Sequence, residues 1–293
     1  MTLTITTPLQ PLQGVRILSL ALNLPGPAAL MRLSQMGAVC LKLEPPQGDP
    51  MRLYSPSVYA QLHDGVEVRV ADLKTEPGQQ LLHQELTQAD VLVTSFRPAA
   101  LVKLGLAWPA LQQRHPRLSQ IAIVGAPGER AEEPGHDLTY LAENDLVTGL
   151  DLPATLYADM GGSLMASEAV LQAVMHQRSQ GHGAYLEVAL SSAAAYLALP
   201  RSWGLTQAGA AVGGGHAGYR VYPCKDGRVA VAALEPHFAL RLCVAAGIDA
   251  GSMKAMFEPT THEAVAAFLL TRTRQELDVL AVEKDIPLCT MED

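Results

Sequence analysis

Short apolar runs alternate with amphipathic stretches through the first half of the chain. Runs rich in Val, Ile, Leu and Ala are typical of buried strands, and helical spacing of apolar residues between them indicates helices. We expect strands at residues 15–20, 38–43, 66–72, 90–94 and 119–124. We expect helices at residues 28–36, 77–88 and 109–114, the first preceded by a turn at Leu24-Pro25-Gly26-Pro27. Strands that alternate with helices predict a parallel sheet with helices on both faces.

The pattern changes in the second half of the chain. A long helix is expected at residues 161–177, a strand at 184–190 and an Ala-rich helix at 191–199. The glycine-rich stretch 208–218 is interpreted as a connector, because no Lys-Ser/Thr follows the glycines as in a phosphate-binding P-loop.

A smaller α+β segment is predicted at the end of the chain. The turn Lys225-Asp226-Gly227 between residues 219–222 and 228–233 predicts a β-hairpin. Helices are expected at residues 236–246, 262–270 and 273–283. We therefore predict an α/β protein with a large domain at residues 1–200, a linker at 201–218 and a small domain at 219–293.

Composition narrows the class of protein. The chain has 293 residues, of which 48% are hydrophobic and 17% charged, which is typical of a globular protein. A net charge of −8 argues against nucleic acid and anionic membranes as partners. The four cysteines form no metal-type pair and no disulfide framework. Since neither a signal peptide nor an apolar run of membrane-spanning length is found, we expect a cytoplasmic protein.

Two short runs carry candidate chemistry. The first run is Pro134-Gly135-His136-Asp137. The second run is Ala158-Asp159-Met160-Gly161-Gly162, in which Asp159 comes 22 residues after Asp137. Each run is predicted to open a helix. Neutral imidazole and carboxylate coexist near pH 7, so His136 and Asp159 could move a proton between two faces of a carbon. The weakly acidic α-proton of a thioester needs such a base and a stabilised enolate. Backbone N–H groups of Gly161 and Gly162, placed at a helix start, are candidate oxyanion donors.

Each of these residues also has a structural explanation. An aspartate just before a helix is a frequent N-cap, so Asp159 could serve only as a cap. His136 could hold a turn, and Glu235 in Leu234-Glu235-Pro236 could be an acidic residue that suits a helix start. Spacing alone leaves both interpretations open.

A series of segments in order resembles the class III CoA-transferase family, and most closely its α-methylacyl-CoA racemase branch. The segments cover nearly the whole chain: 12–18, 37–46, 48–52, 72–74, 89–98, 104–106, 135–137, 158–162, 181–183 and 233–238. The resemblance implies a Rossmann-like large domain with a small α+β domain, and two chains interlocked as a homodimer. It also implies an acyl-CoA substrate, with coenzyme A as part of that substrate and with neither a metal nor a redox cofactor.

The resemblance assigns roles to single residues. In the racemase branch the residues matching His136 and Asp159 are the two bases, and a glutamate like Glu235 supports them from the small domain. In the transferase branch the matching aspartate is a nucleophile that passes through an acyl anhydride and a covalent CoA thioester. The residues expected to bind CoA in the large domain are Leu24, Pro25, Phe96, Arg97 and Lys103.

Three features depart from the family pattern. Leu62-His63-Asp64-Gly65 replaces a basic segment that commonly faces the CoA phosphates, and the loop at residues 125–130 is shorter. The sequence stops at Asp293, whereas full-length relatives return to the large domain, so an open ring or a short subfamily is expected. Three functions remain: an acyl-CoA racemase or epimerase, a CoA-transferase that uses Asp159 as nucleophile, and a non-catalytic CoA-binding protein.

Overall fold

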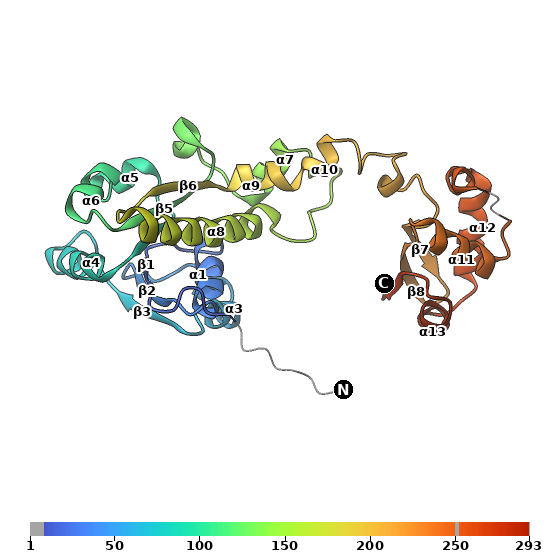
Figure 1. Ribbon diagram of the computed structural model, residues 1–293, viewed down its shortest axis with the longest axis horizontal. Coiled ribbons are helices and arrows are strands. Elements are labelled where there is room, and N and C mark those ends of the chain that lie inside the picture. Colours follow the sequence, from blue (N-terminus) through green and yellow to red (C-terminus); the bar gives the residue numbers. More distant parts are fainter. Residues whose placement is uncertain (1–8, 250–251, 293) are drawn as a thin grey trace. The chain divides into compact units, whose positions relative to one another are not determined.

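The computed structural model describes residues 9–249 and 252–292 and divides the chain into two compact units (Figure 1). The first unit ends at Ala198 and the second begins at Leu199, so the predicted linker at residues 201–218 falls within the second unit. Across the described part of the chain, no helix combines the length and apolarity needed to cross a bilayer.

A six-stranded parallel sheet forms the centre of the first unit. Its strands lie in the order β3-β2-β1-β4-β5-β6, and every neighbouring pair is parallel. Their bounds are β1 Arg16–Ser19, β2 Val39–Glu44, β3 Val66–Val70, β4 Val91–Thr94, β5 Ser119–Val124 and β6 Tyr185–Ala189. This is the strand order of doubly wound nucleotide-binding folds, in which the direction of winding reverses between β1 and β4. The predicted α/β fold is confirmed.

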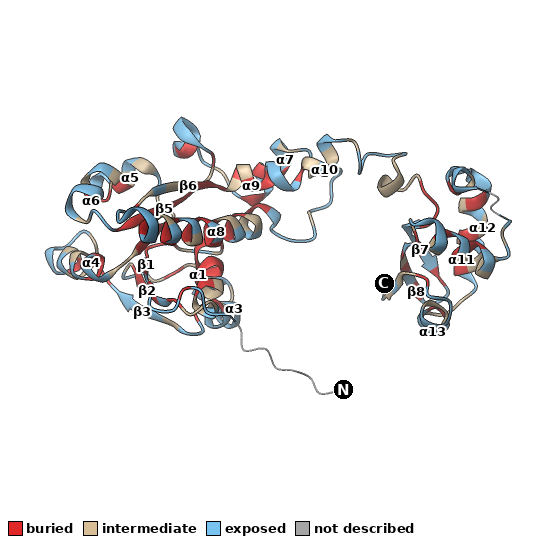
Figure 2. Ribbon diagram, in the orientation of Figure 1, coloured by how far each residue is buried: buried red, intermediate tan, exposed pale blue. Residues whose placement is uncertain are grey.

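Helices cover both faces of this sheet, so its central strands are buried on both sides (Figure 2). On one face, α1 and α8 pack against each other and share a core with β1, β4 and β5. On the other face, Leu82, Leu101 and Leu111 bring α4, α5 and α6 into a second core. The bounds of these helices are α1 Pro25–Gln35, α4 Glu76–Gln88, α5 Pro98–Lys103, α6 Trp108–Arg114 and α8 Tyr157–Gln180.

Shorter helices complete the first unit. They are α2 Met51–Tyr54, α3 Pro56–Leu62, the 3-10 helix η1 Gly128–Glu132, α7 Asp137–Glu143 and α9 Leu190–Leu197. The structure confirms that His136 immediately precedes a helix, because it is the residue before α7.

In the first unit, the starts of two helices were predicted three and four residues too late. The predicted turn at Leu24-Pro25-Gly26-Pro27 is wrong, because α1 already begins at Pro25, where a fixed proline φ suits the first turn of a helix. The long helix α8 begins at Tyr157 rather than Gly161, and Met160 N–H already donates to the Leu156 carbonyl. Asp159 therefore lies inside the first turn of α8, and the two glycines lie beyond it.

The second unit is a small α+β fold. The predicted hairpin is present as β7 Tyr219–Cys224 and β8 Gly227–Ala232, and β9 Leu288–Met291 adds a third antiparallel strand that was not predicted. Side chains from α11, α12 and α13 build its core on this sheet. The remaining bounds are α10 Leu199–Ser202, η2 Ala211–Gly213, α11 Pro236–Ala246, η3 Met253–Phe257, α12 Pro259–Leu270 and α13 Arg274–Lys284.

The glycine run 213–215 is closely packed. A Cβ atom on Gly213 would overlap the carbonyl oxygen of Gln207, and one on Gly215 would overlap that of Gly209. The N–H groups of both glycines donate to the Ala210 carbonyl over 2.9 Å. These glycines allow close backbone contact within the loop, rather than a phosphate cradle.

Candidate active site

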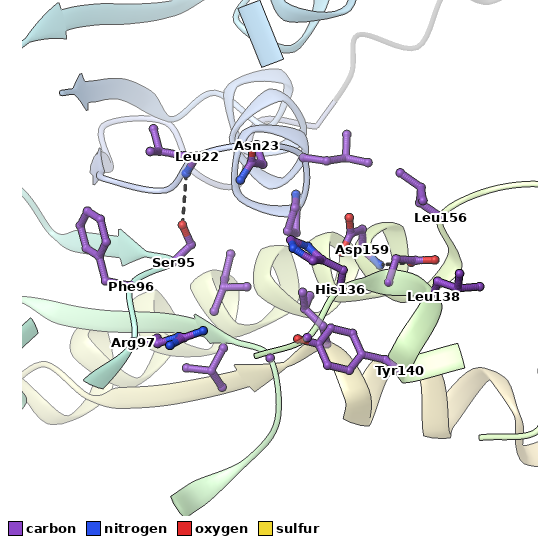
Figure 3. Close-up of a pocket in the computed structure, with 18 of the residues that line it drawn as sticks. Leu22, Asn23, Ser95, Phe96, Arg97, His136, Leu138, Tyr140, Leu156 and Asp159 are labelled. Atoms are coloured by element: carbon purple, nitrogen blue, oxygen red, sulfur yellow. Dashed lines mark hydrogen bonds between the residues drawn. The ribbon is translucent and has the colours of Figure 1, made fainter. Parts of the chain in front are cut away.

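A cavity of the first unit lies where the sheet changes its winding direction. It has a volume of about 540 Å³, and its walls include the residues that follow the carboxyl ends of β1, β4 and β5, together with α7 and the start of α8. Parallel doubly wound sheets bind ligands at this edge, because the connecting segments diverge there and leave a crevice. Figure 3 shows its labelled residues converging from separate elements.

His136 reaches this cavity from the residue before α7. Its backbone is fixed twice, since its N–H donates to Thr139 Oγ1 over 3.1 Å and the Thr139 hydroxyl donates to its carbonyl over 2.7 Å. The imidazole is exposed and lines the cavity (Figure 3). A rigid backbone and an accessible ring are what a proton-transfer group requires.

Asp159 reaches the same cavity from the first turn of α8. The pKa of this carboxyl is raised to about 6. Burial is the largest cause, the charge of Asp137 raises the pKa further, and the charge of His136 lowers it. An ordinary aspartate titrates near 3.8, so Asp159 can hold a proton much closer to neutral pH than most carboxyls. Groups with pKa values near working pH are suited to acid–base catalysis.

Asp137 directly follows His136 in the chain and contacts Asp159, and the sequence analysis gave it no role. It is buried, and its Oδ1 accepts the backbone N–H of Asp159 over 3.0 Å. Leu156, the residue that precedes α8, has no side chain able to cap it. Asp137 therefore supplies from α7 the acceptor that a local N-cap normally provides.

Tyr140 is a second residue that the sequence analysis missed. It is one helical turn after His136, lines the cavity, and packs so close to Gly125 and Gly135 that a Cβ atom on either would overlap its ring or hydroxyl. Burial first, and then the charge of Asp159, raise the pKa of its phenol, which therefore stays protonated. Within the described residues its hydroxyl has no hydrogen-bond partner, so it can donate to a ligand.

The cavity brings together most of the predicted site. His136, Asp159, Leu24, Pro25, Phe96 and Arg97 all line it. Lys103 does not line it and lies exposed at the end of α5. Glu235 belongs to the second unit, where it is exposed immediately before α11, and its role at the site stays a prediction.

The reason for assigning an oxyanion role to Gly161 and Gly162 does not hold. Both glycines lie inside α8, past the first turn whose N–H groups are free of helical partners. A Cβ atom on Gly162 would overlap Cδ2 of Leu190, and one on Gly161 would lie 3.1 Å from Cδ1 of Leu197. The pair instead permits close packing of α8 on α9.

The cavity wall after β1 is held by a buried acidic residue. Asn23 has a positive φ of 66°, and its N–H donates to both carboxylate oxygens of Asp49 over 3.1 and 3.2 Å. Asp49 also accepts the N–H of Met51, another cavity residue, over 2.8 Å. One carboxylate thus ties two segments of the wall together.

Asp49 belongs to a buried group with Glu44, His63 and Lys42. Oxygen and nitrogen atoms of the first three lie close enough to hold a metal ion. The ammonium of Lys42 already occupies this place, since it pairs with Asp49, lies 3.1 Å from Glu44 Oε1 and 2.9 Å from His63 Nε2. This lysine balances the buried acids, as an isolated buried charge would be costly. His63, in the segment that departs from the family pattern, is therefore an internal packing residue.

Comparison with known proteins agrees with this architecture. An α-methylacyl-CoA racemase from Homo sapiens is 29% identical over 78% of this chain and 62% of its own length. A cinnamoyl-CoA:phenyllactate CoA-transferase from Clostridium sporogenes is 29% identical over 62% of this chain and 50% of its own length. The chain thus spans about half the length of the first curated relatives it matches.

Solved structures share the fold. The crystal structure of a hypothetical protein from Mycobacterium tuberculosis superposes with a TM-score of 0.84, 23% identity, and coverage of 98% of this chain and 86% of the other. A CAIB/BAIF family protein from Brucella suis gives a TM-score of 0.81 at 22% identity, with coverage of 98% and 85%. The sequence model of CoA-transferase family III matches residues 12–293, and the chain therefore belongs to that family.

Proposed function

We propose that this chain acts on a CoA thioester as a racemase or epimerase that moves the α-proton between two faces of the carbon. The observation that carries the proposal is the meeting of His136 and Asp159 on one cavity, with the pKa of Asp159 raised to about 6. A racemase needs one group that accepts a proton and one that already holds a proton. A carboxyl with this pKa can take either part near neutral pH.

The proposed reaction has two proton transfers. Neutral His136 takes the α-proton, and the electrons of the broken C–H bond move into the thioester carbonyl to give an enolate. Protonated Asp159 then gives its proton to the opposite face of the carbon, which restores the carbonyl. The reverse reaction exchanges the two roles, so no net proton is gained or lost.

The enolate oxygen needs a hydrogen-bond donor, and Tyr140 is the residue we assign to it. Tyr140 lines the cavity, and its hydroxyl is protonated and has no partner among the described residues. A donor held in a fixed position contributes to stabilising a developing oxyanion because it needs little reorganisation when the charge appears. Glu235 is proposed to support this centre from the second unit.

The CoA part of the substrate is proposed to lie along the sheet edge. Leu24, Pro25 and Phe96 give this wall an apolar surface, and Arg97 gives it an exposed cation for a phosphate. A homodimer is the assembly that we expect, and sedimentation of the purified chain measures it.

CoA transfer is the second candidate, because the relatives include CoA-transferases and Asp159 is open to the cavity. In that reaction the Asp159 carboxylate attacks the thioester carbonyl and expels CoA thiolate, with an acyl anhydride as the product of the first step. His136 takes no proton from carbon in this scheme. The two candidates therefore differ in their dependence on His136.

Deuterium exchange tests the proposal. A 2-methylacyl-CoA is incubated with the chain in D₂O, and incorporation at the α-carbon is measured by mass spectrometry. We expect exchange that falls by about 10²–10⁴-fold in His136→Ala and Asp159→Ala, the range for removal of a general acid or base. His182→Ala, which removes an exposed imidazole at the far end of α8, is the matched control and should exchange normally.

Two results would contradict the racemase. A covalent acyl or CoA adduct on Asp159, found in a peptide digest, together with full transfer activity in His136→Ala would support CoA transfer. Binding of acyl-CoA without exchange or transfer would instead indicate a non-catalytic CoA-binding protein.

A further inference from the structure

Asp137 lines the same cavity as His136, but its side chain is buried whereas the imidazole is exposed. It is only 5% exposed, is the first residue of α7 and follows His136 directly. Its Oδ1 accepts the N–H of Asp159, 22 residues away in the chain, over 3.0 Å. The segment His136-Asp137 thus carries the imidazole and also holds the start of α8.

The contact has a mechanical consequence. The helix α8 is 24 residues long and begins at Leu156-Tyr157 without a side-chain cap of its own. A carboxylate that accepts an N–H in the first turn satisfies a free donor and interacts favourably with the positive end of the helix. Asp137 therefore helps to determine where the first turn, and with it the Asp159 side chain, is held.

The contact also has an electrostatic consequence. The negative charge of Asp137 raises the pKa of Asp159 after burial, which is the larger cause, while the charge of His136 lowers it. The other titratable groups around the site are Tyr140 and Glu143 on α7, Tyr157 in the first turn of α8, and Tyr54, Arg97 and Glu133 in the cavity wall. Of the helices packed on α8, α1 carries Arg32 alone and α9 carries no charged residue. Asp137 and His136 are the charges that act on Asp159.

We propose that Asp137 is a positioning residue of this site: its side chain accepts the N–H of Asp159 and so anchors the first turn of α8, which carries the proposed catalytic carboxyl. Its negative charge adds to burial in favouring the protonated form of Asp159. The catalytic part of this inference rests on the proposed function. The anchoring and the charge effect concern the free protein and can be tested without substrate.

The variants Asp137→Asn and Asp137→Ala separate the two effects. Asparagine keeps an oxygen that can accept the Asp159 N–H and removes the charge, whereas alanine removes both. The full chain is labelled with ¹³C at aspartate carboxyls, and the Asp159 signal is assigned by its loss in Asp159→Asn. Its titration midpoint is then followed by NMR.

We expect a midpoint of about 6 in the unmodified chain. In Asp137→Asn it should move down but stay above the range of an ordinary aspartate, because burial remains. Asp137→Ala should show the same change and also lower the Tm by about 2–4 °C, as expected for loss of a helix cap. An unchanged midpoint in Asp137→Asn would overturn the inference.

A measurement on the unmodified chain covers the case in which both variants fail to fold. The carboxyl signal of Asp137 should show an inflection at the pH where Asp159 titrates, because the two groups interact, and a flat signal there would also overturn the inference.

Activity gives the final distinction. If exchange occurs, the limb of its pH–rate profile that belongs to Asp159 should move to lower pH in Asp137→Asn, which a purely structural residue would not cause. If the unmodified chain shows no exchange, the proposed function fails while the NMR titration still decides the role of Asp137.

Discussion

The Nζ atom of Lys42 lies 2.9 Å from Nε2 of His63, and both side chains are buried. Nδ1 of the same imidazole lies 2.7 Å from the Tyr59 carbonyl, which can only accept, so Nδ1 carries the ring proton and Nε2 accepts from the lysine. Burial lowers the pKa of His63 below its ordinary 6.5, in keeping with this neutral form. The pair thus needs an uncharged histidine beside the ammonium.

This relationship predicts a pH dependence of stability. The unfolded chain binds a proton on His63 more readily than the folded chain does. The contribution of His63 to stability is therefore complete above about pH 6.5 and falls as pH drops from 6.5 toward the lowered pKa. The free energy of unfolding should therefore decrease more between pH 7.5 and pH 5 in the unmodified chain than in His63→Gln. Urea unfolding followed by Trp108 fluorescence, in a Trp203→Phe background, reports on the first unit. Equal changes in the two chains would contradict the prediction.

Asp159 should affect stability in the opposite direction. Its pKa is raised to about 6 in the folded chain, so the folded state binds protons more readily and loses stability as pH rises from about 4 through 6. We expect Asp159→Asn to raise the Tm at pH 7.5 and to change it little at pH 4. The measurement is thermal unfolding at both pH values. The control is Asp151→Asn, which alters an exposed aspartate. An equal rise in the Tm of this control at pH 7.5 would contradict the role assigned to the pKa of Asp159.

Tyr140 should matter for rate rather than folding. Tyr140→Phe keeps the ring between Gly125 and Gly135 and removes only the hydroxyl. We expect deuterium exchange to fall by roughly 10²-fold, as for loss of one oxyanion donor, with the Tm nearly unchanged. Tyr185→Phe removes a hydroxyl outside the cavity and should exchange at the normal rate. Normal exchange in Tyr140→Phe would mean that another group stabilises the enolate.

The two glycines of α8 should differ when each is replaced by alanine. In Gly161→Ala the new Cβ lies 3.1 Å from the exposed Leu197 side chain, which can move, and in ordinary contact with Cβ of Ala193 at 3.4 Å. This variant should therefore gain up to about 1 kcal/mol from higher helix propensity. Gly162→Ala pushes Leu190 out of its packed position, so it should be the less stable of the two variants. Chemical denaturation measures the difference. The reverse order would contradict a packing role for Gly162.

Local patterns predicted most of the fold. Strands of the first unit such as β4 and β5 are short runs rich in apolar residues, and the hairpin of the second unit has a turn signal. Each of these elements could therefore be found without knowledge of its neighbours. The strand β9 could not, because Leu288–Met291 is ordered by pairing with β8 from far away in the chain.

The same distinction applies to the site. His136 and Asp159 stand out in the sequence, but the start of α8 was misplaced because its cap is Asp137, on another element. The interaction of Lys42 with His63 likewise joins residues 21 positions apart, and nothing in either local pattern indicates it. Contacts between elements, which single-sequence patterns do not contain, account for these misses.

The cavity joins two kinds of wall, and this has an evolutionary consequence. The segments after β1 and β4 are anchored to the sheet, whereas His136, Asp137, Tyr140 and Asp159 come from α7, α8 and the residue before α7. A few replacements on the helical side could change the chemistry of the cavity while the sheet side keeps its shape. Such a division is a physical means by which one fold can carry the different reactions named for the racemases and the CoA-transferases to which this chain is similar.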